Sequence, residues 1–191
     1  MLRKTLLITL LIALMTACAP QATPTAAPAA TDITLTDGLG REIKLAAPAQ
    51  HVVSLAPSNT EILFAVGAGS QVVGRDEFSD YPDEAASIES VGGSMGQYSV
   101  EAIVALKPDL VLAAEINTAE LVKQLEDLGL TVYYLKNPLT LEEMYVNLEI
   151  VGQLTGHDVT ELVDSLKARV AAVDEKIVPL SYMPTVFYEI D

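Results

Sequence analysis

The sequence predicts an α/β fold in which a Rossmann-like parallel sheet is followed by one long helix. Apolar runs of strand length alternate with helical segments through residues 51–135, an order that is typical of parallel sheets. The run 110–114, LVLAA, is apolar throughout, as expected of a strand covered on both faces. From Val159 to Ile177 apolar residues recur mostly at helical spacing, which indicates the long helix.

The stretch His51–Glu61, HVVSLAPSNTE, predicts a strand, a tight turn and a helix in that order. Its apolar start has strand length, and Pro57 interrupts it. Ser58 and Glu61 then have the spacing of a capping box at the start of a helix. Because ligands of open α/β sheets bind at the carboxyl ends of strands, we expect binding residues in this turn.

The other elements follow from local signals. Residues 33–45 alternate in polarity around Asp37-Gly38, which predicts a hairpin. Thr140 and Glu143 form a second capping box, whose helix ends near Thr155-Gly156. The remaining predictions are a brief strand at 72–73, a short helix at 83–87, a helix at 100–106 capped by Ser99, a helix starting at Asn117 or Thr118, a strand at 131–135, and a strand at 185–190 that opens a further unit.

Composition excludes some classes of function. The chain has 191 residues, with 11 Lys and Arg against 26 Asp and Glu, and a formal net charge of −15. No basic cluster occurs outside the N-terminus, so the chain lacks the cationic face that nucleic-acid binding requires. Hydrophobic residues make up 50% of the chain, which is enough for an aliphatic core.

The N-terminus has the pattern of an export signal. Arg3 and Lys4 precede a mostly apolar segment, Leu6–Met15, that is too short to span a bilayer. Small residues then lead to Cys18, as in a bacterial lipobox, so we expect residues 1–17 to be removed and Cys18 to carry a lipid. A plain secretory signal with a free thiol is the alternative. Residues 18–31, rich in Ala, Pro and Thr, are predicted to be a disordered tether.

The mature chain resembles the N-terminal half of a class III, or helical-backbone, ABC-transporter solute-binding protein of the cobalamin and iron–siderophore group. The resemblance covers residues 32–178 and rests on four stretches: VVSLAPSNTEILFAVG, VVGRDEFSDYP, SVEAIVALKPDLVLA and LEDLGLTVYYL. It implies an α/β lobe at 32–156, a bridging helix at 157–178, and a second lobe of which 184–191 would be only the first strand. We therefore expect the sequence to be a fragment or a truncated frame.

The resemblance implies a monomeric, non-enzymatic receptor without a cofactor, held by its lipid outside the cytoplasm. It would capture an iron–siderophore, haem or a corrinoid and deliver it to an ABC permease and its ATPase. Glu101 matches the carboxylate that docks on the permease. Where a cobalamin binder has Trp, this chain has Ser94 and Met95, which weakens the cobalamin assignment and leaves siderophores or haem open. The implied ligand-facing residues are Ser58, Asn59, Thr60, Tyr81, Gly93, Ser94, Met95 and Glu115.

Two other functions are weaker hypotheses. A zinc or manganese receptor of related fold would need several converging ligands, but the chain offers only His51 and His157 as histidines. Residues 92–96, GGSMG, match the G-x-S-x-G elbow of serine hydrolases with Ser94 as nucleophile. That elbow needs a strand directly before it and a helix directly after it, and the predicted helix begins only after Ser99.

Overall fold

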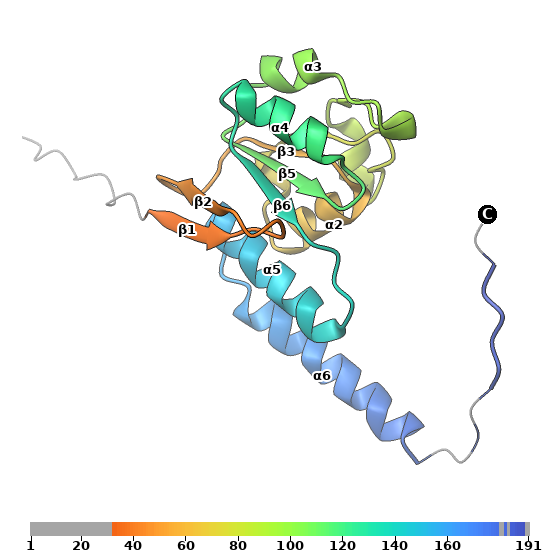
Figure 1. The fold of residues 1–191 in the computed structure, drawn as a ribbon. Coiled ribbons are helices and arrows are strands. Elements are labelled where there is room, and N and C mark those ends of the chain that lie inside the picture. Colours follow the sequence, from red (N-terminus) through yellow and green to blue (C-terminus); the bar gives the residue numbers. More distant parts are fainter. Residues whose placement is uncertain (1–31, 180–181, 183, 190–191) are drawn as a thin grey trace, which may run out of the picture. The chain divides into compact units, whose positions relative to one another are not determined.

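The computed structural model describes residues 32–179, 182 and 184–189. The predicted signal peptide at 1–17, the tether at 18–31 and the lipidation site Cys18 lie outside these residues. Residues 32–179 form the fold, and Figure 1 traces it along the sequence.

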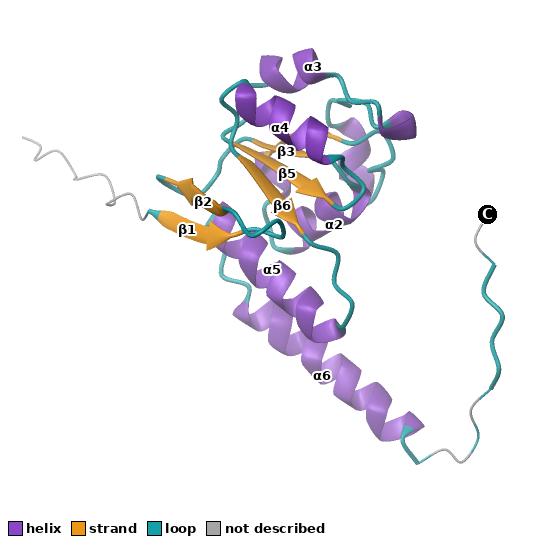
Figure 2. Cartoon of the chain, in the orientation of Figure 1, coloured by secondary structure: helices purple, strands orange, loops and turns teal. Residues whose placement is uncertain are grey.

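The centre of the fold is a four-stranded parallel sheet, as predicted. Its strands run in the order β4–β3–β5–β6, and every neighbouring pair is parallel (Figure 2). Val52 pairs with Leu110, and Val111 pairs with Val132. The bounds are β3 Val52–Ser54, β4 Val72–Arg75, β5 Leu110–Ala114 and β6 Val132–Leu135.

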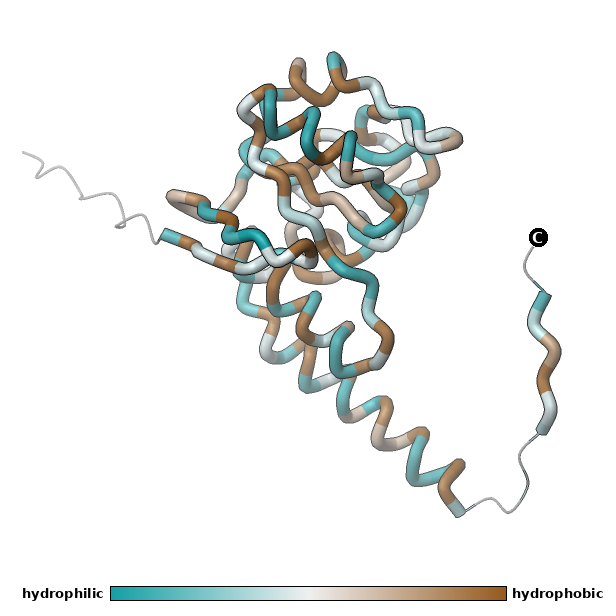
Figure 3. Tube along the Cα trace, in the orientation of Figure 1, coloured by the Kyte–Doolittle hydropathy of each residue, from teal (hydrophilic) through white to brown (hydrophobic). Residues whose placement is uncertain are grey.

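Helices cover both faces of this sheet. Val52, Leu110 and Leu112 point to one face and pack in a core that includes residues of α2 (Pro57–Ala65) and α5 (Leu141–Thr155). Their neighbours on the same strands point to the other face, in a core with residues of α3 (Val100–Ala105) and α4 (Ala119–Asp127). All five residues of β5 are buried, and Figure 3 shows the sheet as predominantly hydrophobic. The result is the three-layer α/β arrangement expected from the sequence.

Most predicted helix ends are confirmed. The hydroxyls of Ser99, Thr118 and Thr140 each accept a backbone N–H in the first turn of α3, α4 and α5. Gly156 ends α5 in the left-handed conformation, with a φ of +79°. The short helix at Asp83–Ser87 is present, but it is a 3₁₀ helix.

The predicted hairpin is confirmed and is attached to the edge of the sheet. Strand β1 (Ile33–Thr36) pairs antiparallel with β2 (Glu42–Leu45). The connection is longer than a two-residue turn and runs over residues 37–41. The Asp37 carboxylate holds it by accepting the N–H groups of Leu39 and Arg41 at 3.0 and 2.9 Å. Gly38 N donates to the Tyr134 carbonyl on β6 at 2.8 Å, which joins the loop to the edge strand.

Helix α6 (Thr160–Ile177) is the long helix that the apolar stripe predicts. Its first half packs against the core through Val163, Leu162 and Leu166, whereas Val173 and Ile177 near its end are exposed. Residues 184–189 have no partner strand among the described residues and carry no strand assignment, so the strand at 185–190 stays a prediction. None of the helices that the structure describes has the length and apolar character to cross a membrane.

Candidate ligand-binding site

The candidate site lies where the order of strands reverses. The chain passes from β3 to β4 on one side and then returns to β5 on the other side of β3. In open α/β sheets the crevice at the carboxyl ends of such a pair is where ligands bind. At this edge lie the loops that follow the four strands, residues 55–56, 76–82, 115–117 and 136–138. Together with the first residues of α2, 57–58, and the loop at 92–97, we call them the mouth.

The turn after β3 differs from the prediction. Ala56 is the N-cap of α2 without a side-chain hydrogen bond, and Pro57 occupies the first turn. Pro57 has no N–H to satisfy and its fixed φ suits a helix start, so the helix begins two residues too early for Ser58 to act as a cap. The capping box of Ser58 and Glu61 is therefore wrong. Ser58 is exposed at the mouth.

Asn59 and Thr60 are buried and form hydrogen bonds inside the protein. Asn59 is 2% exposed, and its Nδ2 donates to the Leu112 carbonyl at 3.1 Å. Thr60 is fully buried, and its hydroxyl donates to Ser54 Oγ at 2.8 Å. One turn of helix places successive side chains on different faces, so only Ser58 of the three remains on the outside. Asn59 and Thr60 attach α2 to the strand ends. Thr60 is removed from the set of ligand contacts, whereas Asn59 also lines a hollow together with Ser58 and Tyr81.

The loop after β4 is held by a buried carboxylate. Asp76 is 2% exposed, and it accepts Phe78 N and Tyr98 Oη, each at 2.8 Å. Burial and the nearby Asp76 carboxylate raise the pKa of the Tyr98 hydroxyl, so the hydroxyl stays protonated at neutral pH and acts as a hydrogen-bond donor. Tyr98 Oη also contacts the Leu55 carbonyl at 2.8 Å, and Asn117 Nδ2 donates to the same oxygen at 3.0 Å. These bonds tie together the loops that follow β3, β4 and β5.

Arg75 is a structural residue of the same loop. Its guanidinium donates to four backbone carbonyls, those of Asp76 and Glu77 at 3.0 Å and those of Ala86 and Ile88 at 3.2 Å. The group therefore stabilises the loop after β4, and its donors are directed at the backbone.

The loop at residues 92–97 depends on glycine. Gly93 has a φ of +123°, and a Cβ placed on it would lie 2.0 Å from Asp76 Oδ2. Gly93 is itself buried and its N–H donates to Gln97 O at 2.8 Å, so it shapes the loop and is corrected from ligand contact to structural residue. Ser94 and Met95 are exposed, Met95 at 96%.

Four large side chains project from the mouth without cover in the described residues. Phe78 is 59% exposed, Tyr81 65%, Met95 96% and Ile116 66%. Tyr81 and Met95 were predicted, but Phe78 and Ile116 were not, because an isolated apolar residue in a loop carries no sequence signal that separates packing from exposure. Glu115, next to Ile116, is also exposed.

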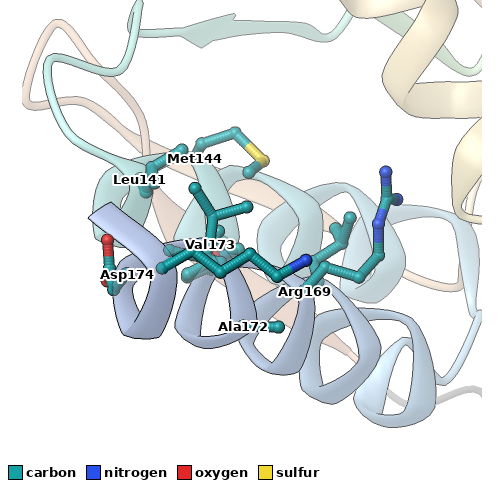
Figure 4. A pocket seen from close by; sticks show the side chains of 10 residues that line it. Leu141, Met144, Arg169, Ala172, Val173 and Asp174 are labelled. Carbon is teal, nitrogen blue, oxygen red and sulfur yellow. The ribbon is translucent and has the colours of Figure 1, made fainter. Parts of the chain in front are cut away.

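A hollow of about 500 Å³ opens beside Tyr81. It lies between α2 and the loop after β6, and Ser58, Tyr81, Lys136 and Asn137 are among its lining residues. A separate groove of about 630 Å³ lies between α5 and α6. Figure 4 shows its lining, which includes Met144 and Val173 with Arg169 at one side.

The described residues do not bring together the ligands of a zinc or manganese site or the catalytic groups of a serine hydrolase. His51 directly precedes β3, and His157 follows α5 at the end where Leu154 O accepts Ala49 N at 2.8 Å. Both histidines therefore lie at the amino edge of the sheet, whereas Ser94 lies at the carboxyl edge, so Ser94 has neither histidine as a base. Among the described residues, no three His, Cys, Asp or Glu side chains converge as a metal site.

Comparison with known proteins decides the family. A sequence profile of the periplasmic binding protein family matches residues 52–188, which is most of the chain. The chain belongs to the periplasmic binding protein family. This confirms the resemblance drawn from the four sequence stretches. YvrC of Bacillus subtilis, described as an uncharacterized ABC transporter substrate-binding lipoprotein, is 35% identical over 154 residues, covering 78% of this chain and 48% of YvrC.

Solved structures agree with the fold of this periplasmic binding protein. The vitamin B12-binding protein BtuF of Vibrio cholerae superposes with a TM-score of 0.61 at 31% identity, over 69% of this chain and 52% of BtuF. A periplasmic haem-binding protein of Pseudomonas aeruginosa gives 0.58 at 29% identity, over 67% of this chain and 45% of that protein. The chain thus spans about half the length of the proteins it matches.

Proposed function

We propose that this periplasmic binding protein is the substrate-binding component of an ABC importer and holds a large iron chelate, haem or a corrinoid at its mouth. Family membership supports a receptor, and the relatives described above are named for vitamin B12 and haem. The residues that would contact the ligand are Ser58, Tyr81, Ser94, Met95 and Glu115, together with Phe78 and Ile116.

The exposed side chains of Phe78, Tyr81, Met95 and Ile116 carry this proposal. All four stand on loops at the same edge of the sheet, and exposed large apolar groups at one edge favour a binding site there. Aromatic rings also stack on flat conjugated systems such as a corrin or porphyrin. Beneath them, the hydrogen bonds of Asp76, Tyr98 and Asn117 fix the loops, so the surface is formed before a ligand arrives.

Chemical-shift mapping by NMR tests the site directly. The probes are diamagnetic: cyanocobalamin, gallium protoporphyrin and the gallium complex of a hydroxamate siderophore. Because the chain spans about half the length of its relatives, we expect weak binding, with shifts concentrated in the mouth. Tyr81→Ala should lower the affinity for the probe about tenfold, since loss of an aromatic contact costs about 1–1.5 kcal/mol.

Leu128→Ala is the matched control. Leu128 is 55% exposed, like Tyr81, but it follows α4 at the amino edge of the sheet. We expect it to leave the affinity unchanged. Shifts that centre on the groove between α5 and α6, or no shifts with any probe, would contradict the proposed site.

We further propose that α6, with residues 157–178, is the bridging helix between this lobe and a second lobe. Its 18 helical residues span about 27 Å. The exposure of Val173 and Ile177 and the apolar groove against α5 support a further packing partner for its second half.

Glu101 is proposed to dock on an arginine of the permease. It is exposed in the first turn of α3, beyond the Ser99 cap. Charge pairs at the rim of an interface mainly set register and association rate. We expect Glu101→Arg to reduce binding to the cognate permease–ATPase pair at least tenfold, as read by co-purification. Glu161→Arg, which changes another exposed first-turn acid at the opposite edge of the sheet, should have no effect.

Cys18 is proposed to carry the lipid that anchors the protein outside the cytoplasm. The only cysteine of the chain follows an export-like segment. Metabolic labelling with palmitate should mark the wild-type protein and be lost in Cys18→Ser. Labelling that persists in the variant would exclude this anchor.

A further inference from the structure

We propose that the mouth selects neutral or cationic chelates and disfavours anionic ones, because its ionisable rim consists almost entirely of carboxylates. This inference rests on the proposed function and narrows its ligand class. It favours corrinoids and hydroxamate-type iron chelates over haem, which carries two propionates, and over catecholate chelates, which are polyanions.

The carboxylates stand on the same loops as the exposed apolar side chains. Glu77 and Asp80 flank Phe78 in the loop after β4, and Glu115 precedes Ile116 after β5; all three are exposed. Glu61 lines the hollow beside Tyr81 and also a second hollow that Tyr81 lines. A ligand that contacts Phe78, Tyr81 or Ile116 would therefore lie next to one of these carboxylates.

Cations at this edge do not offset these charges. The chain has 11 Lys and Arg, of which Arg3 and Lys4 lie outside the described residues, leaving 11 − 2 = 9. Arg75 directs its guanidinium at four backbone carbonyls. Lys136, which lines the hollow, is the remaining cation of the described mouth. The other seven lie on the hairpin, after α3, on α4 or on α6: Arg41, Lys44, Lys107, Lys123, Lys167, Arg169 and Lys176.

The size of the effect depends on ionic strength. Like charges a few ångströms apart at a partly desolvated surface change binding on the order of tenfold, and salt screens the exposed part of that interaction. An anionic chelate should therefore bind more tightly as salt is added, a cationic one less tightly, and a neutral one with little change. The direction of this salt dependence does not depend on how much affinity the apolar contacts supply.

The test compares three diamagnetic probes on the 191-residue chain: cyanocobalamin, the cationic gallium complex of desferrioxamine B, and anionic gallium protoporphyrin. NMR titrations at low and at physiological ionic strength give the affinities. At low ionic strength we expect the neutral or the cationic probe to bind at least about tenfold more tightly than the anionic probe, and salt to narrow the difference.

Charge-neutral variants separate electrostatics from shape. The variant Glu77→Gln, Asp80→Asn, Glu61→Gln should reduce the difference in affinity between the anionic and cationic probes to within about threefold. The matched control Glu149→Gln, Glu161→Gln, Asp164→Asn removes three exposed acids away from the mouth and should keep the difference. Preferential binding of the anionic probe at the mouth overturns this inference and leaves the proposed function intact. No binding of any probe overturns both.

Discussion

Replacing Gly93 by alanine is expected to destabilise the lobe by about 3–4 kcal/mol, because the new Cβ would meet a buried carboxylate. The Cβ would lie 2.0 Å from Asp76 Oδ2 and 2.9 Å from Asp76 Cγ. Asp76 cannot move away without losing the bonds from Phe78 N and Tyr98 Oη, each worth about 1 kcal/mol or more. The φ of +123° adds backbone strain for any residue with a Cβ. Urea unfolding measures the loss.

Gly96→Ala is the control within the same loop. Gly96 has a φ of +75°, but a Cβ placed on it has no neighbour within 4 Å. The only cost of Gly96→Ala is then the left-handed backbone conformation, which lowers the stability by about 1 kcal/mol. Equal losses for the two variants would show that the contact with Asp76 is not what requires glycine at Gly93. Because the mouth is built on this contact, Gly93→Ala should also abolish ligand shifts in the mouth.

Replacing Asp37 by alanine is expected to cost about 3 kcal/mol, because it removes the charged partner of Arg41 from a buried position. The Asp37 side chain is fully buried, and Arg41 Nε donates to it at 2.9 Å. It also accepts the N–H groups of Leu39 and Arg41, and that of Tyr134 on β6 at 3.3 Å. Its loss should detach the hairpin from β6, and urea unfolding followed by amide exchange at β1 and β2 would detect both effects.

Glu42→Ala on the same hairpin is the control. Glu42 pairs with Lys44 at 2.8 Å, but both side chains are more than 60% exposed. An exposed pair contributes little, so the expected change is within about 0.5 kcal/mol. Comparable losses for Asp37→Ala and Glu42→Ala would contradict the structural role given to Asp37.

The same carboxylate gives the lobe a dependence on acid. Burial alone would raise the pKa of Asp37, but the hydrogen bonds and charge of Arg41 outweigh burial and hold the pKa below 3.8. A lowered folded-state pKa means that this stabilisation is present above about pH 4, the unfolded value, and is lost as the pH falls through the folded value. Between these two values wild type should lose stability more steeply than Asp37→Asn, as measured by thermal unfolding at stepped pH.

Local sequence patterns identified the framework of this protein with few errors. The apolar run at 110–114 is the fully buried β5, and the hydroxyl caps at Ser99, Thr118 and Thr140 are present. These features succeed because strand burial and helix capping depend on residues that are adjacent in sequence. The Ser58 cap failed because Pro57 can start the helix itself, so two local signals competed and proline prevailed.

The site was harder to predict from the residues alone. Ser58, Asn59 and Thr60 are consecutive, yet only Ser58 is exposed, since the helix turns the other two toward Leu112 and Ser54. Gly93 matched the family pattern, but its role is to make room for Asp76, a residue far from it in sequence. Phe78 and Ile116 have no motif around them, and only their exposure identifies them as candidates.

By itself, the sequence determined the α/β class, the positions of the strands and most helix starts, and the family to which the chain belongs. Each of these depends on short-range periodicity or on motifs that are read along the chain. The tertiary structure alone decided which side chains face the mouth, and that Arg75 and Asp76 serve the loops. Arg75 bonds to carbonyls along its own loop. The role of Asp76 depends on contacts between loops that follow different strands, and parallel connections bring such loops together only when the sheet has formed.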